Sequence, residues 1–144
     1  AGTLTIGDRA TLGCADAPVS LTVHPGATLA IGQRAIINFG VSIDAHAAIT
    51  IGNDVSIGPY CVIDDSGSST VDPPQPITIG DDCWIATRVV VMPGCTIGAG
   101  AVITAGSFVD GDVPPRVVFG GVPARLRRHL DPVPATDEPP VEHT

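Results

Sequence analysis

Large aliphatic residues recur at every sixth position through the C-terminal part of the chain. The series is Ile79, Ile85, Val91, Ile97, Ile103 and Val109. The position after each is small or polar in five of the six cases. A period of six matches neither the 3.6 residues of a helical turn nor the simple alternation of a single strand. It predicts a short strand followed by a turn, repeated many times, with the aliphatic side chain pointing inward.

The same unit recurs upstream as a four-residue motif in which an aliphatic residue, a variable residue, an isoleucine and a glycine follow one another. Three hexads close one triangular coil. The isoleucines that start successive coils are Ile6, Ile31, Ile51, Ile79 and Ile97. The last interval equals three hexads, whereas the first and third exceed it most, which places extra residues in excursions at 14–22 and 64–76. The second excursion is polar and bounded by prolines, which predicts a projecting loop.

This register predicts an all-β parallel β-helix of about five coils with three stacked faces. The first face carries the five isoleucines that start the coils. The second face is predicted to carry Leu12, Ile37, Ile57, Ile85 and Ile103. The third is predicted to carry Val23, Ile43, Ile63, Val91 and Val109. Such a one-dimensional stack needs its ends covered.

The chain divides into one predicted domain and a tail. Residues 1–130 form the β-helix domain. Within it, residues 114–130 leave the period and are expected to end in a short C-terminal helix that caps the stack. Residues 131–144 hold four prolines and four acidic residues and are expected to form a flexible, solvated tail.

Composition limits the function further. Of the 144 residues, 44% are hydrophobic but only 3% are aromatic, which indicates a thin aliphatic core. The net charge of −8 argues against nucleic-acid binding, where neutralising phosphate dominates affinity. No apolar run approaches the ~20 residues of a membrane span.

Three of the four cysteines fall four residues after an inward aliphatic residue, where the chain otherwise places Ala, Val or Ser. They are Cys61, Cys83 and Cys95. We interpret them as small, free, buried thiols. No Cys-x-x-Cys occurs, so neither a zinc ribbon nor a redox pair is indicated. Reduced cysteines favour the cytoplasm as the location.

Several motifs carry a family resemblance that covers about residues 23–130. They are Asp81-Asp82-Cys83-Trp84-Ile85-Ala86, Met92-Pro93-Gly94-Cys95-Thr96-Ile97-Gly98, Ala105-Gly106-Ser107, Asp112-Val113-Pro114-Pro115 and Gly121-Val122-Pro123-Ala124-Arg125. The chain resembles the hexapeptide-repeat acyltransferases, and within them the sugar and polysaccharide O-acetyltransferases. The resemblance implies a left-handed β-helix, a homotrimer, and acetyl-CoA or another acyl-CoA bound between subunits. An acceptor hydroxyl would attack the thioester directly.

The resemblance also implies residues for the acyl donor. The pantetheine path would be lined by Ala86, Thr104, Ala105 and Gly106. Trp84 would form either a wall of the donor groove or a trimer contact. The nucleotide phosphates would meet Arg125, Arg127 and Arg128. Charge supports this last point independently, because four of the seven cations of an acidic chain gather between Arg116 and Arg128, and guanidinium groups suit phosphate. The alternative is a solvated charge run at the end of a helix.

The chain departs from the family at the projecting loop, which would bind the acceptor through Asp65, Ser66 and Ser69. In the family this loop normally supplies a histidine that deprotonates the acceptor hydroxyl. Here Ser66 and Ser69 stand at the expected places, and no histidine lies between His46 and His129. A serine hydroxyl is too weakly basic to serve as a general base near neutral pH.

His46 is the best replacement candidate for the base. The register places it one coil from Ser66, at the corner where the loop leaves, and its alternative role is that of an exposed corner residue. Asp64 and Asp65 are alternative bases, although exposed carboxylates are poor bases for an alcohol. Asn38 matches an asparagine with which the sugar acetyltransferases hold the acceptor. A simple corner residue is the alternative there too.

Three functions follow from these residues. The first is acyl-CoA-dependent O-acyl transfer to a sugar, a polysaccharide precursor or a small alcohol. The second is a non-catalytic trimer with a structural or regulatory role, which the missing loop histidine favours. The third is a metal site of the carbonic-anhydrase kind, which needs three imidazoles on zinc. Only His24 and His46 lie in the coils, so no metal is expected. The arginine-rich C-terminal segment favours the enzyme.

Overall fold

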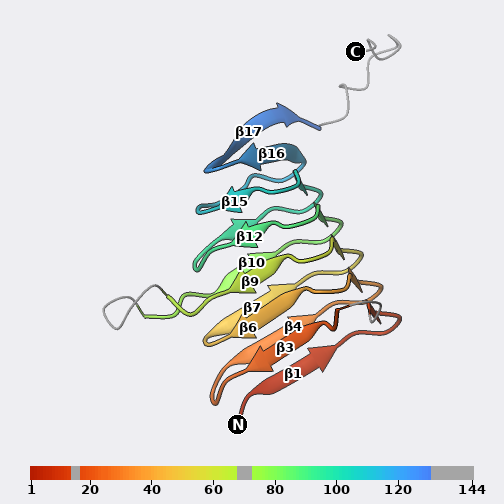
Figure 1. Ribbon diagram of the computed structural model, residues 1–144, viewed down its shortest axis with the longest axis vertical. Helices are drawn as coiled ribbons and strands as arrows, with labels where there is room; N and C mark the ends of the chain where they lie inside the picture. Colours follow the sequence, from red (N-terminus) through yellow and green to blue (C-terminus); the bar gives the residue numbers. More distant parts are fainter. Residues whose placement is uncertain (14–16, 68–72, 131–144) are drawn as a thin grey trace.

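The computed structural model describes residues 1–13, 17–67 and 73–130. Within these ranges the chain forms seventeen strands and no helix. The strands stack as successive coils from the N-terminus at one end of the molecule to β17 at the other (Figure 1). No helix in the described part is therefore long and apolar enough to cross a membrane.

Three sheets form the three faces of the coil, and each face takes one strand from every coil. Sheet A contains β1 (Thr3–Ile6), β4 (Thr28–Ile31), β7 (Ala48–Ile51), β10 (Ile77–Ile79) and β13 (Thr96–Ile97). Sheet B contains β2 (Thr11–Leu12), β5 (Ile36–Ile37), β8 (Ser56–Ile57), β11 (Trp84–Ile85), β14 (Val102–Ile103), β16 (Val117–Gly121) and β17 (Ala124–His129). Sheet C contains β3 (Ser20–Val23), β6 (Ser42–Ala45), β9 (Val62–Asp64), β12 (Val90–Val91) and β15 (Phe108–Val109).

The predicted stacking on the first two faces is confirmed. The coil-start isoleucines pair in one ladder, from Ile6 with Ile31 to Ile79 with Ile97. The second face pairs Leu12 with Ile37 and continues to Ile103. These side chains fill the prism, and from the second coil upward they are buried. In the first coil they are exposed, because no coil lies below them.

The third face corrects the prediction at its lowest strand. Leu21, not Val23, pairs with Ile43, and Val23 pairs with Ala45. The pairing then continues as expected through Ile63 to Val91 and Val109. Leu21 and Val23 are two residues apart in one strand and both point inward, so the apolar pattern fits either register. Because β3 begins at Ser20, the first excursion is shorter than the predicted 14–22.

The expected C-terminal helix is wrong. Residues 117–129 instead form a β-hairpin in which β16 and β17 pair in antiparallel fashion. β16 extends sheet B, because Val118 pairs with Val102 and Phe119 with Ile103. The β-branched and aromatic residues of β16 suit a strand, and β17 then has an open edge to pair with. The hairpin lies at the upper end of the stack (Figure 1). That residues 114–130 cap the domain stays a prediction.

The three cysteines lie in the core as free thiols. Each Sγ lies within hydrogen-bond distance of a backbone carbonyl on a neighbouring coil. Burial raises the pKa of all three, and that of Cys95 reaches about 11. They are therefore neutral at physiological pH, which agrees with the role of small core residues. The predicted tail, residues 131–144, lies outside the described residues.

Candidate active site

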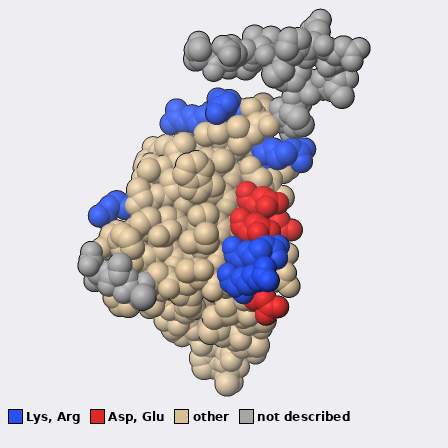
Figure 2. Space-filling view, turned by 90° about the vertical axis from the view of Figure 1, so that its right-hand side faces the viewer, with Lys and Arg blue, Asp and Glu red and all other residues tan. Residues whose placement is uncertain are grey.

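Three turns join the sheets in each coil and stack into three edges, which we name AB, BC and CA after the sheets they connect. Charged side chains of both signs follow one another along the AB edge, and one side of Figure 2 shows such a row. Arg34 and Asp54 on this edge form an ion pair at 2.8 Å. Arg34 lowers the pKa of Asp54. Both side chains are exposed, and the residues predicted to act in function lie elsewhere.

Two histidines and an aspartate meet at the CA edge of the two lowest coils. Nε2 of His24 lies 2.7 Å from Oδ1 of Asp44, and Nε2 of His46 lies 3.2 Å from the same oxygen. The two imidazole rings stack with centroids 3.8 Å apart and an interplanar angle of 19°. All three side chains are partly exposed, so they are open to solvent and to a ligand.

The parallel ladder of β3 and β6 creates this cluster. Val23 pairs with Ala45, and the His24 amide donates to the Ala45 carbonyl at 2.9 Å. His24 and His46 are therefore the next pair of positions on adjacent coils, about 4.8 Å apart in a parallel sheet. Asp44 points outward from β6, two residues before His46, and its carboxylate reaches both rings.

Asp65 holds the turn that carries His46. It is fully buried, and its carboxylate accepts backbone hydrogen bonds from His46 at 2.6 Å, Ala47 at 3.0 Å and Ala48 at 2.8 Å. Both oxygens are thus occupied, which argues against the predicted contact of Asp65 with the acceptor. The same burial removes it as an alternative base. Sequence alone could not separate Asp65 from Asp64, because both stand where the loop leaves.

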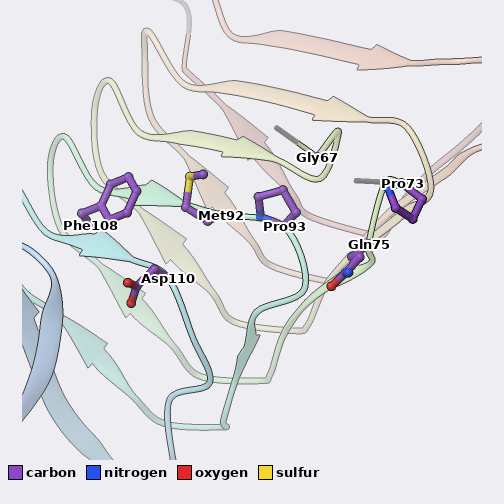
Figure 3. Close-up of a pocket in the computed structure, with 7 residues that line it drawn as sticks. All are labelled: Gly67, Pro73, Gln75, Met92, Pro93, Phe108 and Asp110. Atoms are coloured by element: carbon purple, nitrogen blue, oxygen red, sulfur yellow. The ribbon is translucent and has the colours of Figure 1, made fainter. Parts of the chain in front are cut away.

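An apolar groove runs along the outer surface of sheet C beside this edge. Its cavity of about 270 Å³ is lined by Gly67, Pro73, Gln75, Met92, Pro93, Phe108 and Asp110 (Figure 3). A neighbouring cavity of about 240 Å³ shares three of these residues and extends to Val62, Asp64 and Ser66. The loop leaves and returns here, since the Gln75 amide donates to the Asp65 carbonyl at 3.0 Å.

Of the predicted acceptor residues, Ser66 lies at the groove. Its backbone amide donates to Oδ1 of Asp64 at 2.8 Å, which fixes the first residues of the loop. By register, Ser66 occupies the position one coil above His46, since Asp44 pairs with Asp64. Ser69 lies outside the described residues.

The residues predicted for the pantetheine path lie on the BC edge. Ala105 and Gly106 are exposed, while Ala86 and Thr104 are half-buried. The Thr104 hydroxyl lies 3.0 Å from that of Ser107, which in turn accepts the Gly121 amide at 3.0 Å. This edge is therefore tied to the C-terminal hairpin.

The predicted phosphate-binding arginines lie on β17, at the end of the molecule where blue side chains gather in Figure 2. Nη1 of Arg125 is 3.7 Å from Oδ1 of Asp110, which lines the groove. Nε of Arg127 donates to the Gly120 carbonyl at 3.2 Å. Arg128 is exposed. These arginines therefore lie at exposed positions on an edge strand and not at the end of a helix.

Asn38 and Trp84 occupy separate places on the surface. Nδ2 of Asn38 donates to the Ile57 carbonyl at 3.1 Å, so the amide bridges two coils at the BC edge. Trp84 projects outward from sheet B with 57% of its surface exposed. In a single chain, sheet C separates the BC edge from His46. The structure therefore joins His46 with Asp44, Ser66 and the groove, but not with Asn38 or the predicted donor residues.

His24 is the residue that sequence reasoning missed. The signal was the register, because a third face that aligns Leu21 with Ile43 places His24 directly beside His46. The choice of Val23 in place of Leu21 shifted that strand by two positions and hid the pairing.

Comparison with known proteins identifies the family of this chain. Residues 76–111 match the family model described as bacterial transferase hexapeptide (six repeats). A hexapeptide-repeat acetyltransferase from Vibrio cholerae, solved with acetyl coenzyme A, is similar at 34% identity and a TM-score of 0.77, over 89% of this chain and 72% of that one. The chain belongs to the hexapeptide-repeat acetyltransferases.

Other members of this family match over less of their length. Galactoside O-acetyltransferase of Escherichia coli is 38% identical over 114 residues, which is 74% of this chain and 56% of that protein. Serine acetyltransferase of Bacillus subtilis is 35% identical over 106 residues, 74% of this chain and 47% of that protein. A galactoside acetyltransferase solved with coenzyme A aligns with a TM-score of 0.74 and 32% identity, over 90% of this chain and 65% of that one. This hexapeptide-repeat chain thus spans about half the length of the curated relatives it matches.

Proposed function

We propose that this chain transfers an acetyl group from acetyl-CoA to a hydroxyl of a sugar, a polysaccharide precursor or a small alcohol. The observation that carries the proposal is the contact of Asp44 with His46 beside an apolar groove, in a chain of an acetyltransferase family. Relatives named for a galactoside and for serine support a hydroxyl acceptor, because both compounds carry one.

The chemistry needs a base for the acceptor hydroxyl. The hydroxyl oxygen attacks the thioester carbonyl carbon, the C–S bond breaks, and the sulfur of coenzyme A leaves and takes up a proton. Imidazole is the side chain best suited to accept the hydroxyl proton near neutral pH. The Asp44 carboxylate hydrogen-bonds Nε2 of His24 at 2.7 Å and lies 3.2 Å from Nε2 of His46 as an ion-pair contact. With Nε2 turned toward this carboxylate, Nδ1 of His46 is the nitrogen that would serve as the base, and Asp44 is a positioning residue for the ring.

The donor would lie along the BC edge toward the C-terminal hairpin. Exposed small residues such as Ala105 and Gly106 let a pantetheine chain approach the backbone closely. Arg125, with Arg127 and Arg128 on the same strand, supplies positive charge for the nucleotide phosphates. Trp84 and Asn38 remain proposed contacts of the donor and the acceptor.

A homotrimer would bring the two halves of the site together. Within one chain, sheet C lies between the CA edge, which carries His46, and the BC edge, which carries the proposed donor residues. A second subunit whose BC edge lies against the CA groove of the first would complete a site, and three identical contacts close a ring. Exposed apolar residues away from the core, Ile36, Tyr60, Val62 and Trp84, support such a contact surface. The free thiols suit the cytoplasm as the proposed compartment.

A second candidate is a trimer without catalytic activity. It is favoured by one observation, the lack of any histidine between His46 and His129, where the loop of the family carries its base. His46 lies one coil below that loop, so the candidates differ in whether this imidazole reaches the acceptor.

A turnover assay tests the proposal. The protein is incubated with acetyl-CoA and a panel of glycosides, polyols and serine, while thiol release and the mass of the acceptor are followed. We expect an acetylated acceptor, and a rate at least ~100-fold lower for His46→Ala, the size of a general-base contribution. His129→Ala, an exposed histidine on β17, is the matched control and keeps the rate. Turnover unaffected by His46→Ala would contradict the assignment, and no transfer to any acceptor would favour the second candidate.

A further inference from the structure

We infer that His24, Asp44 and His46 form a binding site for a divalent transition-metal ion of the Zn²⁺, Co²⁺ or Ni²⁺ class. In the part of the chain that the structure describes, these are the three metal-ligating side chains whose donor atoms converge, all within 4.8 Å of one another. Asp44 lies on β6, and His24 and His46 lie in the turns that follow β3 and β6, which are adjacent strands of sheet C.

The distances approach those of a coordination sphere. Ligand atoms about 2.0–2.2 Å from a tetrahedral ion lie roughly 3.3 Å from each other. Oδ1 of Asp44 is 2.7 Å from Nε2 of His24 and 3.2 Å from Nε2 of His46. Small rotations of the side chains place an ion between the two nitrogens and the oxygen, in contact with all three.

The donor set has suitable chemistry. Two imidazoles and one carboxylate are the ligands that favour zinc, iron, cobalt and nickel over magnesium or calcium. The carboxylate offsets part of the charge of the ion, and a second carboxylate, Asp64, stands at the paired position on β9. The stacked rings present both Nε2 atoms to one carboxylate oxygen, so the ligands need little reorganisation.

The surroundings hold the ligands in place and leave the ion accessible. The backbone of His24 is tied to Ala45, and that of His46 to the buried Asp65. The ligand side chains keep 40%, 34% and 28% of their surface exposed, for His24, Asp44 and His46 respectively. An ion bound by three protein ligands keeps open positions that water or a small ligand fills.

Metal binding and the proposed acetyl transfer use the same side chains in different ways. An ion on Nε2 of His46 replaces the contact with Asp44 through which that imidazole is oriented as a base. The test is therefore made on the full chain without acetyl-CoA, so its outcome does not depend on whether the chain transfers acetyl groups.

Calorimetric titration of the metal-free protein with Zn²⁺ tests the site, with the visible absorption of Co²⁺ as the report on its ligands. We expect one ion per chain, and binding at least tenfold weaker for His24→Ala and for Asp44→Asn. His129→Ala and Asp82→Asn are the matched controls for an imidazole and a carboxylate away from the cluster, and they bind as the wild type does.

Two results would overturn the inference: no Zn²⁺ uptake by the wild type, or uptake by His24→Ala with wild-type affinity. Circular dichroism establishes that each variant is folded. If His24→Ala does not fold, His24→Gln replaces it, because glutamine keeps a polar side chain on the strand but removes the imidazole nitrogen.

Discussion

The buried carboxylate of Asp65 accepts the backbone N–H of His46 at 2.6 Å. One coil thus fixes the turn of the coil below it, at the corner where the chain leaves β9. A histidine on that turn has a defined position before any ligand arrives, which is the condition for it to act as a base or as a ligand.

Removal of this anchor should destabilise the fold. Asp65→Ala leaves three backbone N–H groups without their acceptor in a buried place, and we expect a loss on the order of 3 kcal/mol in the free energy of unfolding. Urea denaturation measures it. Asp64→Ala is the matched control, because Asp64 is half-buried and accepts the N–H of Ser66; its loss should be about 1 kcal/mol. Equal losses would show that Asp65 does not hold the corner.

Asp44→Asn should slow acetyl transfer without abolishing acetyl-CoA binding. An asparagine lacks the negative charge that lies 3.2 Å from Nε2 of His46, so kcat should fall about 10–100-fold, less than the roughly 100- to 10,000-fold loss expected when a general base itself is removed. Asp82→Asn, on the AB edge, should leave kcat unchanged. A kcat in Asp44→Asn equal to that of the wild type would separate Asp44 from the base.

The contact between the C-terminal hairpin and the BC edge leaves no space for a side chain at Gly120. A Cβ there would overlap the hydroxyl oxygen of Thr104, whereas one at Gly111 meets nothing within 4 Å. Gly120→Ala should therefore lower the free energy of unfolding by about 1–3 kcal/mol, and Gly111→Ala should be close to neutral. Thermal denaturation compares the two. Equal melting temperatures would indicate that the hairpin does not pack on Thr104 as described.

Stability should fall as the pH rises above the ordinary range of a thiol. Burial raises the pKa of Cys95 from 9.0 to about 11, so the folded state holds its proton where the unfolded state has lost it. The unfolded state then binds fewer protons, and the free energy of unfolding declines between about pH 9 and pH 11. Cys95→Ala should flatten part of this decline in chemical denaturation at each pH. A wild type whose stability is constant over this interval would contradict the buried thiol.

The hexad predicted the fold well because each inward residue contacts its own equivalents in the next coil. Ile31, Ile51 and Ile79 need no distant information to find their partners, since the period and the coil length define the register. The C-terminal hairpin was not predicted, because Arg125–His129 has residues compatible with a helix. Its strand conformation comes from the free edge of β16, which is a tertiary property.

The sequence predicted that His46 lies near the loop, and the structure adds Asp44 and His24 beside it. The role of His46 as a base stays a prediction. A correct register for β3 would have given the pairing of His24 with His46 from sequence. The role of Asp65 could not be predicted from the sequence. Asp65 is buried and Asp64 is only half-buried, and this difference depends on the direction in which each side chain points.

Acetyl-CoA binding by calorimetry tests the central claim most directly. The wild type is compared with a variant in which Arg125, Arg127 and Arg128 are replaced by alanine, and with Arg34→Ala as a control on the AB edge. The proposed donor site predicts measurable binding that the triple replacement weakens at least tenfold, about 1.4 kcal/mol, and that Arg34→Ala leaves unchanged. No detectable binding by the wild type would contradict the acetyltransferase proposal, and equal affinity in the triple variant would remove the arginines from the donor site.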